Sequence, residues 1–205
     1  KRMVNREMKI KVGILSLQGA FREHFKRLEE CGISAVEIRL PGQLDGIDAL
    51  IIPGGESTTM KRLFKKYNFK SRLDKFYKDG KPMFVTCAGL ILIAKDVEGE
   101  GKGLGYIDVG VKRNAYGRQI DSFEELLNIN IDGSRNGRKF KSIFIRAPKI
   151  LNIGEKVEVL GKFGQDAVLL RDNSVLASTF HPELTDDLRI HKYFINMIKN
   201  SKGDT

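Results

Sequence analysis

Residues 82–94 read PMFVTCAGLILIA, and this stretch decides the fold. Its apolar and β-branched start predicts a strand at 82–86, and the apolar run that follows predicts a helix. Cys87 stands between them and is followed by two small residues. Such a strand-to-helix turn is the sequence form of a nucleophile elbow, which exposes the central side chain while the helix N-terminus favours a thiolate. The alternative interpretation of Cys87 is a buried core cysteine.

The chain before this elbow alternates strands and helices. Ser57 is expected to cap the second helix. The almost unbroken apolar run at 47–52 is typical of a parallel strand that is covered on both faces. The hydrophobic spacing predicts strands at 10–17, 35–40 and 47–52, and helices at 21–30, 57–67 and 71–78.

The chain after residue 95 is rich in short strands separated by Gly, Asn and Asp, and it ends in a helix at 186–199. The glycine-rich segment 99–105 lacks the preceding strand and following helix of a phosphate loop, so we expect a flexible connection there. The predicted strands are 107–111, 127–131, 143–145, 157–160, 167–170 and 175–179.

These elements predict one α/β domain at residues 9–200, in which helices flank a mostly parallel sheet with a small antiparallel extension. Residues 1–8 are expected to form a disordered N-terminal extension, and residues 201–205 a C-terminal tail.

Composition excludes several classes of protein. The longest apolar run, residues 90–94, is too short to cross a bilayer, and the polar N-terminus does not resemble a secretory signal, so we expect a cytoplasmic protein without membrane contact. The two cysteines, Cys31 and Cys87, are too few for a disulfide framework or a zinc ribbon. The net charge of +10 is spread along the chain without alternating aromatic residues, so we expect no nucleic-acid partner.

The segment His181-Pro182-Glu183 supplies a base and a group to orient it. Proline keeps the residue before it extended, and in an extended chain residues two apart point the same way. Glu183 can then accept a hydrogen bond from one imidazole nitrogen and leave the other to take the Cys87 proton. By itself this segment could equally be a surface turn. The two other histidines, His24 and His191, lie in helical stretches and are interpreted as structural or surface residues.

A third element is the turn Pro53-Gly54-Gly55, which follows the buried strand at 47–52. Two glycines let the backbone approach a ligand closely and direct an N–H group at developing negative charge. An ordinary strand-to-helix turn is the alternative interpretation.

In this order the three elements resemble those of the class I (triad) glutamine amidotransferases. The wider motif set is similar to that of the glutaminase subunits of pyridoxal 5′-phosphate synthases, and it extends over nearly the whole chain from residue 9. The motifs are LQGA at 17–20, REH at 22–24, PGGESTTM at 53–60, TCAGL at 86–90, RN at 113–114, GRQ at 117–119, DSFE at 121–124, FIRAP at 144–148 and FHPELT at 180–185.

The resemblance implies a flavodoxin-like fold and a glutaminase reaction. Cys87 would attack the side-chain amide of L-glutamine, release ammonia and form a glutamyl thioester that water hydrolyses. The backbone N–H groups of Gly55 and Ala88 would form the oxyanion hole. The residues implied to line the glutamine site are Gly55, Glu56, Ser57, Arg113, Ile145 and Arg146.

The resemblance also implies a partner and the absence of a cofactor. Ammonia would pass to a separate synthase subunit, with Gln18 near the contact, and neither a metal nor an organic cofactor would be held. Two other functions remain open on the residues alone: a glutaminase that serves another pathway, such as purine or histidine synthesis, and a catalytically silent module that only binds a partner. A nucleic-acid binder is supported by net charge alone.

Overall fold

A computed structural model of the chain describes residues 10–115, 122–131 and 138–203. The expected N-terminal extension at 1–8, the motif residues 117–119 and Asp121 therefore lie outside the described residues.

A seven-stranded sheet forms the centre of the molecule, in the order β11-β12-β13-β4-β3-β1-β2. Neighbouring strands among β2, β1, β3, β4 and β13 pair in parallel. Beyond β13, the strands β12 and β11 extend the sheet with antiparallel pairing. This confirms the predicted mostly parallel sheet with an antiparallel extension. The strands are β1 (Val12–Leu15), β2 (Ala35–Ile38), β3 (Ala49–Ile52), β4 (Met83–Thr86), β11 (Glu158–Phe163), β12 (Asp166–Asp172) and β13 (Val175–Ser178).

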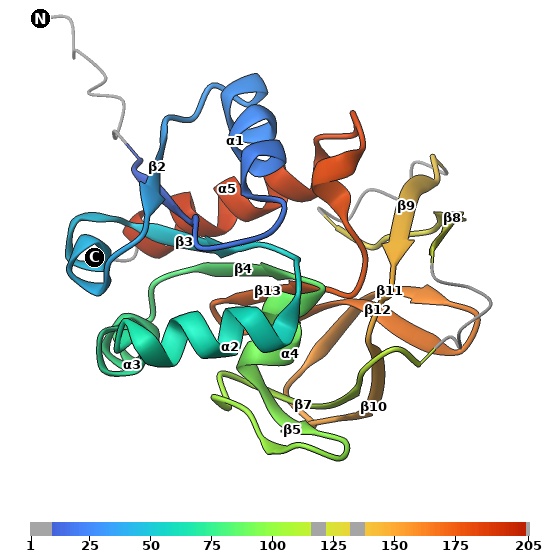
Figure 1. Ribbon diagram of the computed structural model, residues 1–205. Helices are drawn as coiled ribbons and strands as arrows, with labels where there is room; N and C mark the ends of the chain where they lie inside the picture. Colours follow the sequence, from blue (N-terminus) through green and yellow to red (C-terminus); the bar gives the residue numbers. More distant parts are fainter. Residues whose placement is uncertain (1–9, 116–121, 132–137, 204–205) are drawn as a thin grey trace, which may run out of the picture.

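Helices cover both faces of this sheet, as Figure 1 shows. Side chains alternate across a strand, so in β4 Phe84 packs beneath α1 (Phe21–Glu30) and α5 (Arg189–Gly203), while Met83 and Val85 join the core on the opposite face. That opposite face is covered by α2 (Ser57–Lys66), α3 (Phe69–Lys78) and α4 (Ala88–Ile93). Two 3₁₀ turns complete the set, η1 (Pro41–Gly46) and η2 (Pro182–Leu184).

Two smaller sheets lie beside the antiparallel end of the large one (Figure 1). One has the order β10-β7-β5-β6, and the other pairs β8 with β9. Their strands are β5 (Ala94–Val97), β6 (Gly101–Lys102), β7 (Ile107–Lys112), β8 (Ser122–Leu127), β9 (Phe140–Ile145) and β10 (Lys149–Ile153).

Several predicted boundaries were wrong in this half. The strand predicted at 127–131 is not formed: β8 ends at Leu127, and Ile129 makes only an isolated bridge to Gly161. The segment 99–105 is not simply a flexible connection, because β6 pairs antiparallel with β5 inside it. The last helix begins at Arg189 and continues to Gly203, three residues into the expected tail.

Candidate active site

The elbow after β4 holds Cys87 in a strained backbone conformation, with φ 46° and ψ −102°. A positive φ is costly for a residue other than glycine, and it persists only where the surroundings hold it. Here the Cys87 amide donates to the Ser178 carbonyl oxygen at 2.8 Å. A Cβ on Gly89 would lie 2.4 Å from the Ile52 carbonyl oxygen, so the second small residue after the cysteine is required. The side chain of Val85, two residues before the cysteine, is buried in the core.

His181 follows β13 and reaches the same point from the neighbouring strand. Its amide donates to the Ile143 carbonyl oxygen at 2.8 Å, and its ring Nδ1 lies 2.7 Å from Glu183 Oε1. The two side chains share one side, as predicted, but the reason differs: the chain turns into η2 at Pro182 and does not stay extended. The Arg27 Nε–H of α1 donates to the Glu183 carbonyl oxygen at 3.2 Å and holds this turn in place.

The imidazole of His181 connects Cys87 with Glu183. Burial opposes protonation of the ring, but hydrogen bonds with Cys87 and Glu183, together with the negative charge of both groups, outweigh it and raise the pKa of His181 to about 10. The Cys87 Sγ also lies 3.7 Å from the Ile145 carbonyl oxygen. A thiol, an imidazole and a carboxylate in this sequence can together form a nucleophile, a base and an orienting group.

The glycine turn after β3 packs directly against this pair. The Gly54 amide donates to Thr86 Oγ1 at 2.8 Å, and a Cβ on Gly54 would lie 2.3 Å from His181 Cε1. Gly55 contacts the side chain of Gln18, whose Oε1 accepts from the Glu56 amide at 3.1 Å. Gln18 therefore lies against the glycine turn and lines the same cavity as Cys87 and His181.

A cavity of about 400 Å³ opens in front of Cys87 at the carboxyl ends of the parallel strands. Open α/β sheets bind their ligands at this edge. Ala88 does not line the cavity, because its side chain is buried and only its backbone amide could serve a ligand. The lining residues are Gln18, Ala20, Gly54, Gly55, Glu56, Ser57, Cys87, Ile91, Arg113, Asn114, Ile145, Arg146, His181 and Leu184.

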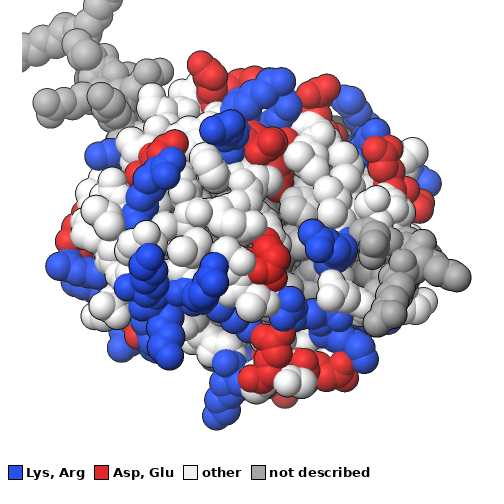
Figure 2. Space-filling view, in the orientation of Figure 1, with Lys and Arg blue, Asp and Glu red and all other residues white. Residues whose placement is uncertain are grey.

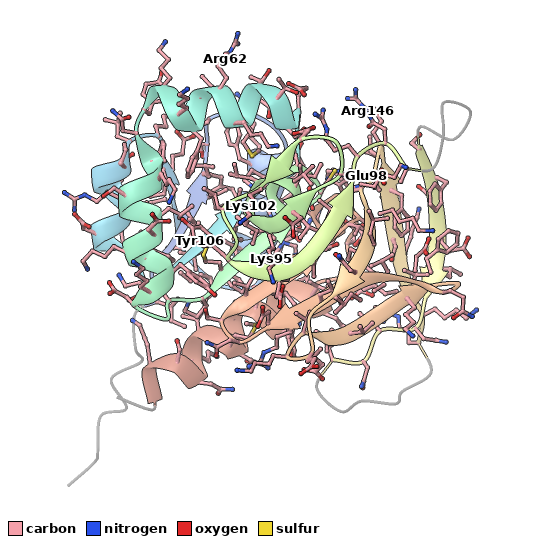
Figure 3. The ribbon with its side chains drawn as sticks, turned by 90° about the horizontal axis from the view of Figure 1, so that it is seen from below. Arg62, Lys95, Glu98, Lys102, Tyr106 and Arg146 are labelled. Carbon is pink, nitrogen blue, oxygen red and sulfur yellow. The ribbon has the colours of Figure 1, made fainter. Side chains whose placement is uncertain are left out.

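The charged residues at the mouth of the cavity are partly paired. Arg113 Nη1 lies 2.5 Å from Glu100 Oε1, and its Nη2 lies 3.8 Å from Glu56 Oε1. Arg146 projects outward from the loop after β9 (Figure 3). Glu100 was missed at the sequence level because it lies in the glycine-rich segment. On the face drawn in Figure 2 basic and acidic side chains are intermingled, in keeping with the spread of charge along the sequence.

Glu56, and not Ser57, is the N-cap of α2, which corrects the expected cap. Its carboxylate accepts hydrogen bonds from the amides of Thr58 at 2.9 Å and Thr59 at 2.6 Å. Hydrogen bonds from the side chain of Thr59 and from these two amides lower the pKa of Glu56 to about 2.

Comparison with known proteins decides the family. The profile of the SNO glutamine amidotransferase family matches residues 14–200. The chain belongs to this family. It is 51% identical over 191 residues to the pyridoxal 5′-phosphate synthase subunit PdxT of Thermosipho africanus, covering 93% of this chain and 100% of the relative. It is also 51% identical over 194 residues to the PdxT subunit of Bacillus cereus, covering 94% and 97%.

Solved structures agree with this family. A crystal structure of a glutamine amidotransferase matches with a TM-score of 0.84 and 46% identity, covering 92% of this chain and 98% of the other. The structure of PurLQS from Thermotoga maritima matches with a TM-score of 0.70 over 95% and 99% of the two chains. At 16% identity the second match shows a shared fold alone.

Two general features complete this description of the SNO family member. Among residues 10–115, 122–131 and 138–203, no three His, Cys, Asp or Glu side chains are grouped as a metal would require. Within the same ranges, no helix has the length and apolar character needed to span a membrane.

Both histidines outside the cavity proved to be fully buried, so the surface interpretation was wrong for His24 and His191. They lie behind Glu183, on the side away from the cavity. A signal was present in the sequence: His24 falls three residues after Phe21 and four before Leu28, on the apolar stripe of its helix.

Proposed function

We propose that this chain is the glutaminase subunit of a pyridoxal 5′-phosphate synthase, hydrolysing L-glutamine to L-glutamate and ammonia. The observation that carries the proposal is the contact of Cys87, His181 and Glu183 at the base of a cavity, in a chain about half identical to PdxT subunits. The 46% identical glutamine amidotransferase structure supports the same reaction class.

In the proposed reaction Cys87 has already passed its thiol proton to His181, in keeping with the raised pKa of that imidazole, and the sulfur attacks the amide carbon of glutamine as a thiolate. Glu183 stabilises the imidazolium that forms. The backbone amides of Gly55 and Ala88 would stabilise the tetrahedral oxyanion. Collapse of this intermediate breaks the C–N bond, and His181 returns the proton to the departing ammonia. Water then attacks the glutamyl thioester, again through His181, and gives glutamate and the free thiol.

The charged mouth of the cavity suits the zwitterionic end of glutamine. Arg113 and Arg146 would bind its α-carboxylate, and Glu56 its α-amino group. Ser57 and Ile145 would line the rest of the site.

The partner in this proposal is the synthase subunit, which would receive the ammonia, with Gln18 near the contact. Support comes from the names of the relatives, which are subunits of a synthase. A cytoplasmic location belongs to the same proposal and fits the two free thiols, Cys31 and Cys87.

The test is release of glutamate and ammonia from glutamine, measured with and without the cognate synthase subunit. The native chain should turn over, and Cys87→Ala should not. Cys31→Ala is the matched control, because it removes the other free thiol at the end of α1, away from the cavity. Absence of native turnover in both conditions would refute the proposal, and turnover by Cys87→Ala would move the nucleophile elsewhere.

A further inference from the structure

Two buried histidines continue the line of side chains behind Glu183. His24 of α1 places its Nε2 3.5 Å from Glu183 Oε2, and its Nδ1 lies 3.1 Å from Nε2 of His191 on α5. His24, His191 and Glu183 are all completely buried. Both histidine rings also pack edge-on against Phe84, with centroid distances of 5.7 Å and 5.6 Å. The residues thus form a closed polar cluster within an apolar layer.

Counting protons fixes the direction of the hydrogen bonds in this cluster. Burial, followed by the charges of His191 and His181, lowers the pKa of His24 well below its ordinary value, so the ring is neutral and carries one N–H. If Nδ1 carried that proton, the lone pair of His24 Nε2 would face the Glu183 carboxylate, and the Nδ1–H of His191 would be a buried donor without a partner among the described residues. Both consequences are unfavourable.

The opposite tautomer removes both conflicts. His24 Nε2 then carries a proton on the side of Glu183 Oε2; the two atoms lie 3.5 Å apart, and neither has a hydrogen-bond partner among the described residues. His24 Nδ1 accepts from the Nε2–H of His191, and the His191 Nδ1, which has no partner among the described residues, then carries a lone pair and not a buried N–H. The groups that face Glu183 are therefore His181 from its own turn, His24 from α1, and Arg27, whose guanidinium binds the Glu183 carbonyl oxygen.

We propose that His24 is a positioning residue for the glutaminase reaction: its Nε2–H holds the second oxygen of Glu183, so that the first stays on His181. This inference rests on the proposed function. A neutral donor suits the task, because it restrains the carboxylate without cancelling the charge that stabilises the His181 imidazolium. His191 holds His24 in the required tautomer and acts one step further away.

The tautomer is measurable in the native chain, independently of turnover. The ¹⁵N chemical shifts of the imidazole nitrogens distinguish a protonated ring nitrogen from an unprotonated one. The expected result is a neutral His24 protonated at Nε2. A neutral His24 protonated at Nδ1, or a positively charged ring, would overturn the inference.

Substitution tests the consequence for the reaction, measured with the cognate synthase subunit present. His24→Leu removes the donor, and we expect kcat to fall by about tenfold or more, the usual effect of losing a hydrogen bond to a charged group. KM for glutamine should stay unchanged, because His24 does not line the cavity. His24→Gln keeps an acceptor for His191 and a donor for Glu183, so it should restore most of kcat.

Phe194→Leu is the matched control, since Phe194 is buried beside Phe84 in the same layer and is apolar. It should lower the melting temperature but leave kcat near the native value. Native kcat in a folded His24→Leu variant, or an equal loss in His24→Gln, would overturn the inference. Absence of native turnover would instead count against the proposed function, and the tautomer would still be tested.

Discussion

Gly54 stands between the two reactive side chains, and adding a single methyl group there tests the geometry of the pair. A Cβ at this position would lie 2.3 Å from His181 Cε1 and 3.2 Å from the Cys87 Cβ. Carbon atoms in contact lie about 3.5 Å or more apart, so the imidazole ring must retreat by roughly 1 Å. The backbone at Gly54 is not in the left-handed region, so alanine itself causes no strain there.

The size of the effect follows from this displacement. A misplacement of about 1 Å in a reacting group costs roughly 100-fold in rate, which corresponds to about 2.7 kcal/mol of transition-state stabilisation. We therefore expect Gly54→Ala to lower kcat for glutamate release by about two orders of magnitude while the chain stays folded.

The control is Gly42→Ala, because a Cβ at Gly42 would meet no atom within 4 Å. Both variants and the native chain are compared by glutamate release with the synthase subunit, and by thermal unfolding. A folded Gly54→Ala variant whose kcat stays within about threefold of the native value would refute the reasoning, because it would mean that the ring position does not limit the reaction.

Three further predictions concern the triad and the cap of α2. His181→Asn should lower kcat about as much as Cys87→Ala, since triad members act as a unit, and activity retained in the asparagine variant would exclude His181 as the base. Because the pKa of His181 rises from 6.5 to about 10 in the fold, its protonation stabilises the fold fully below pH 6.5, and this contribution is lost as the pH approaches 10. The free energy of unfolding, compared between native chain and His181→Asn, should therefore differ most below pH 6.5; a gap that widens with pH would contradict this. The pKa of Glu56 falls to about 2, so the stability it gives α2 is present above pH 4.5 and lost as the pH falls toward 2. Melting temperatures of native chain and Glu56→Ala should accordingly converge on acidification, and a constant difference would argue against a charged cap.

The parallel half of the fold was predictable because its strands are covered on both faces and read as continuous apolar runs. β3 is buried at every residue, and the sequence shows it as an unbroken apolar segment. β10 was not predicted, because most of its residues are exposed or half-buried and its pairing with β7 contains a register shift. Local pattern carries little information on such edge strands, whose position depends on distant partners.

For the site, too, the sequence predicts what a local motif encodes and misses contacts between distant segments. Cys87 and His181 stood out because each follows a buried strand, Cys87 directly and His181 three residues after the strand ends, in a short recognisable motif. The contact between His24 and His191 joins residues 167 positions apart, and it forms only because α1 and α5 lie on the same face of the sheet. No spacing in the sequence encodes a pairing of that kind.

A covalent intermediate on Cys87 tests the central claim most directly. The native chain, mixed with glutamine and the synthase subunit and quenched in acid during turnover, should carry one glutamyl group on the peptide that contains Cys87 when measured by mass spectrometry. The Cys87→Ala chain should carry none. A glutamyl group on another residue, or glutamate release by the native chain with no adduct under conditions that slow thioester hydrolysis, would contradict the account.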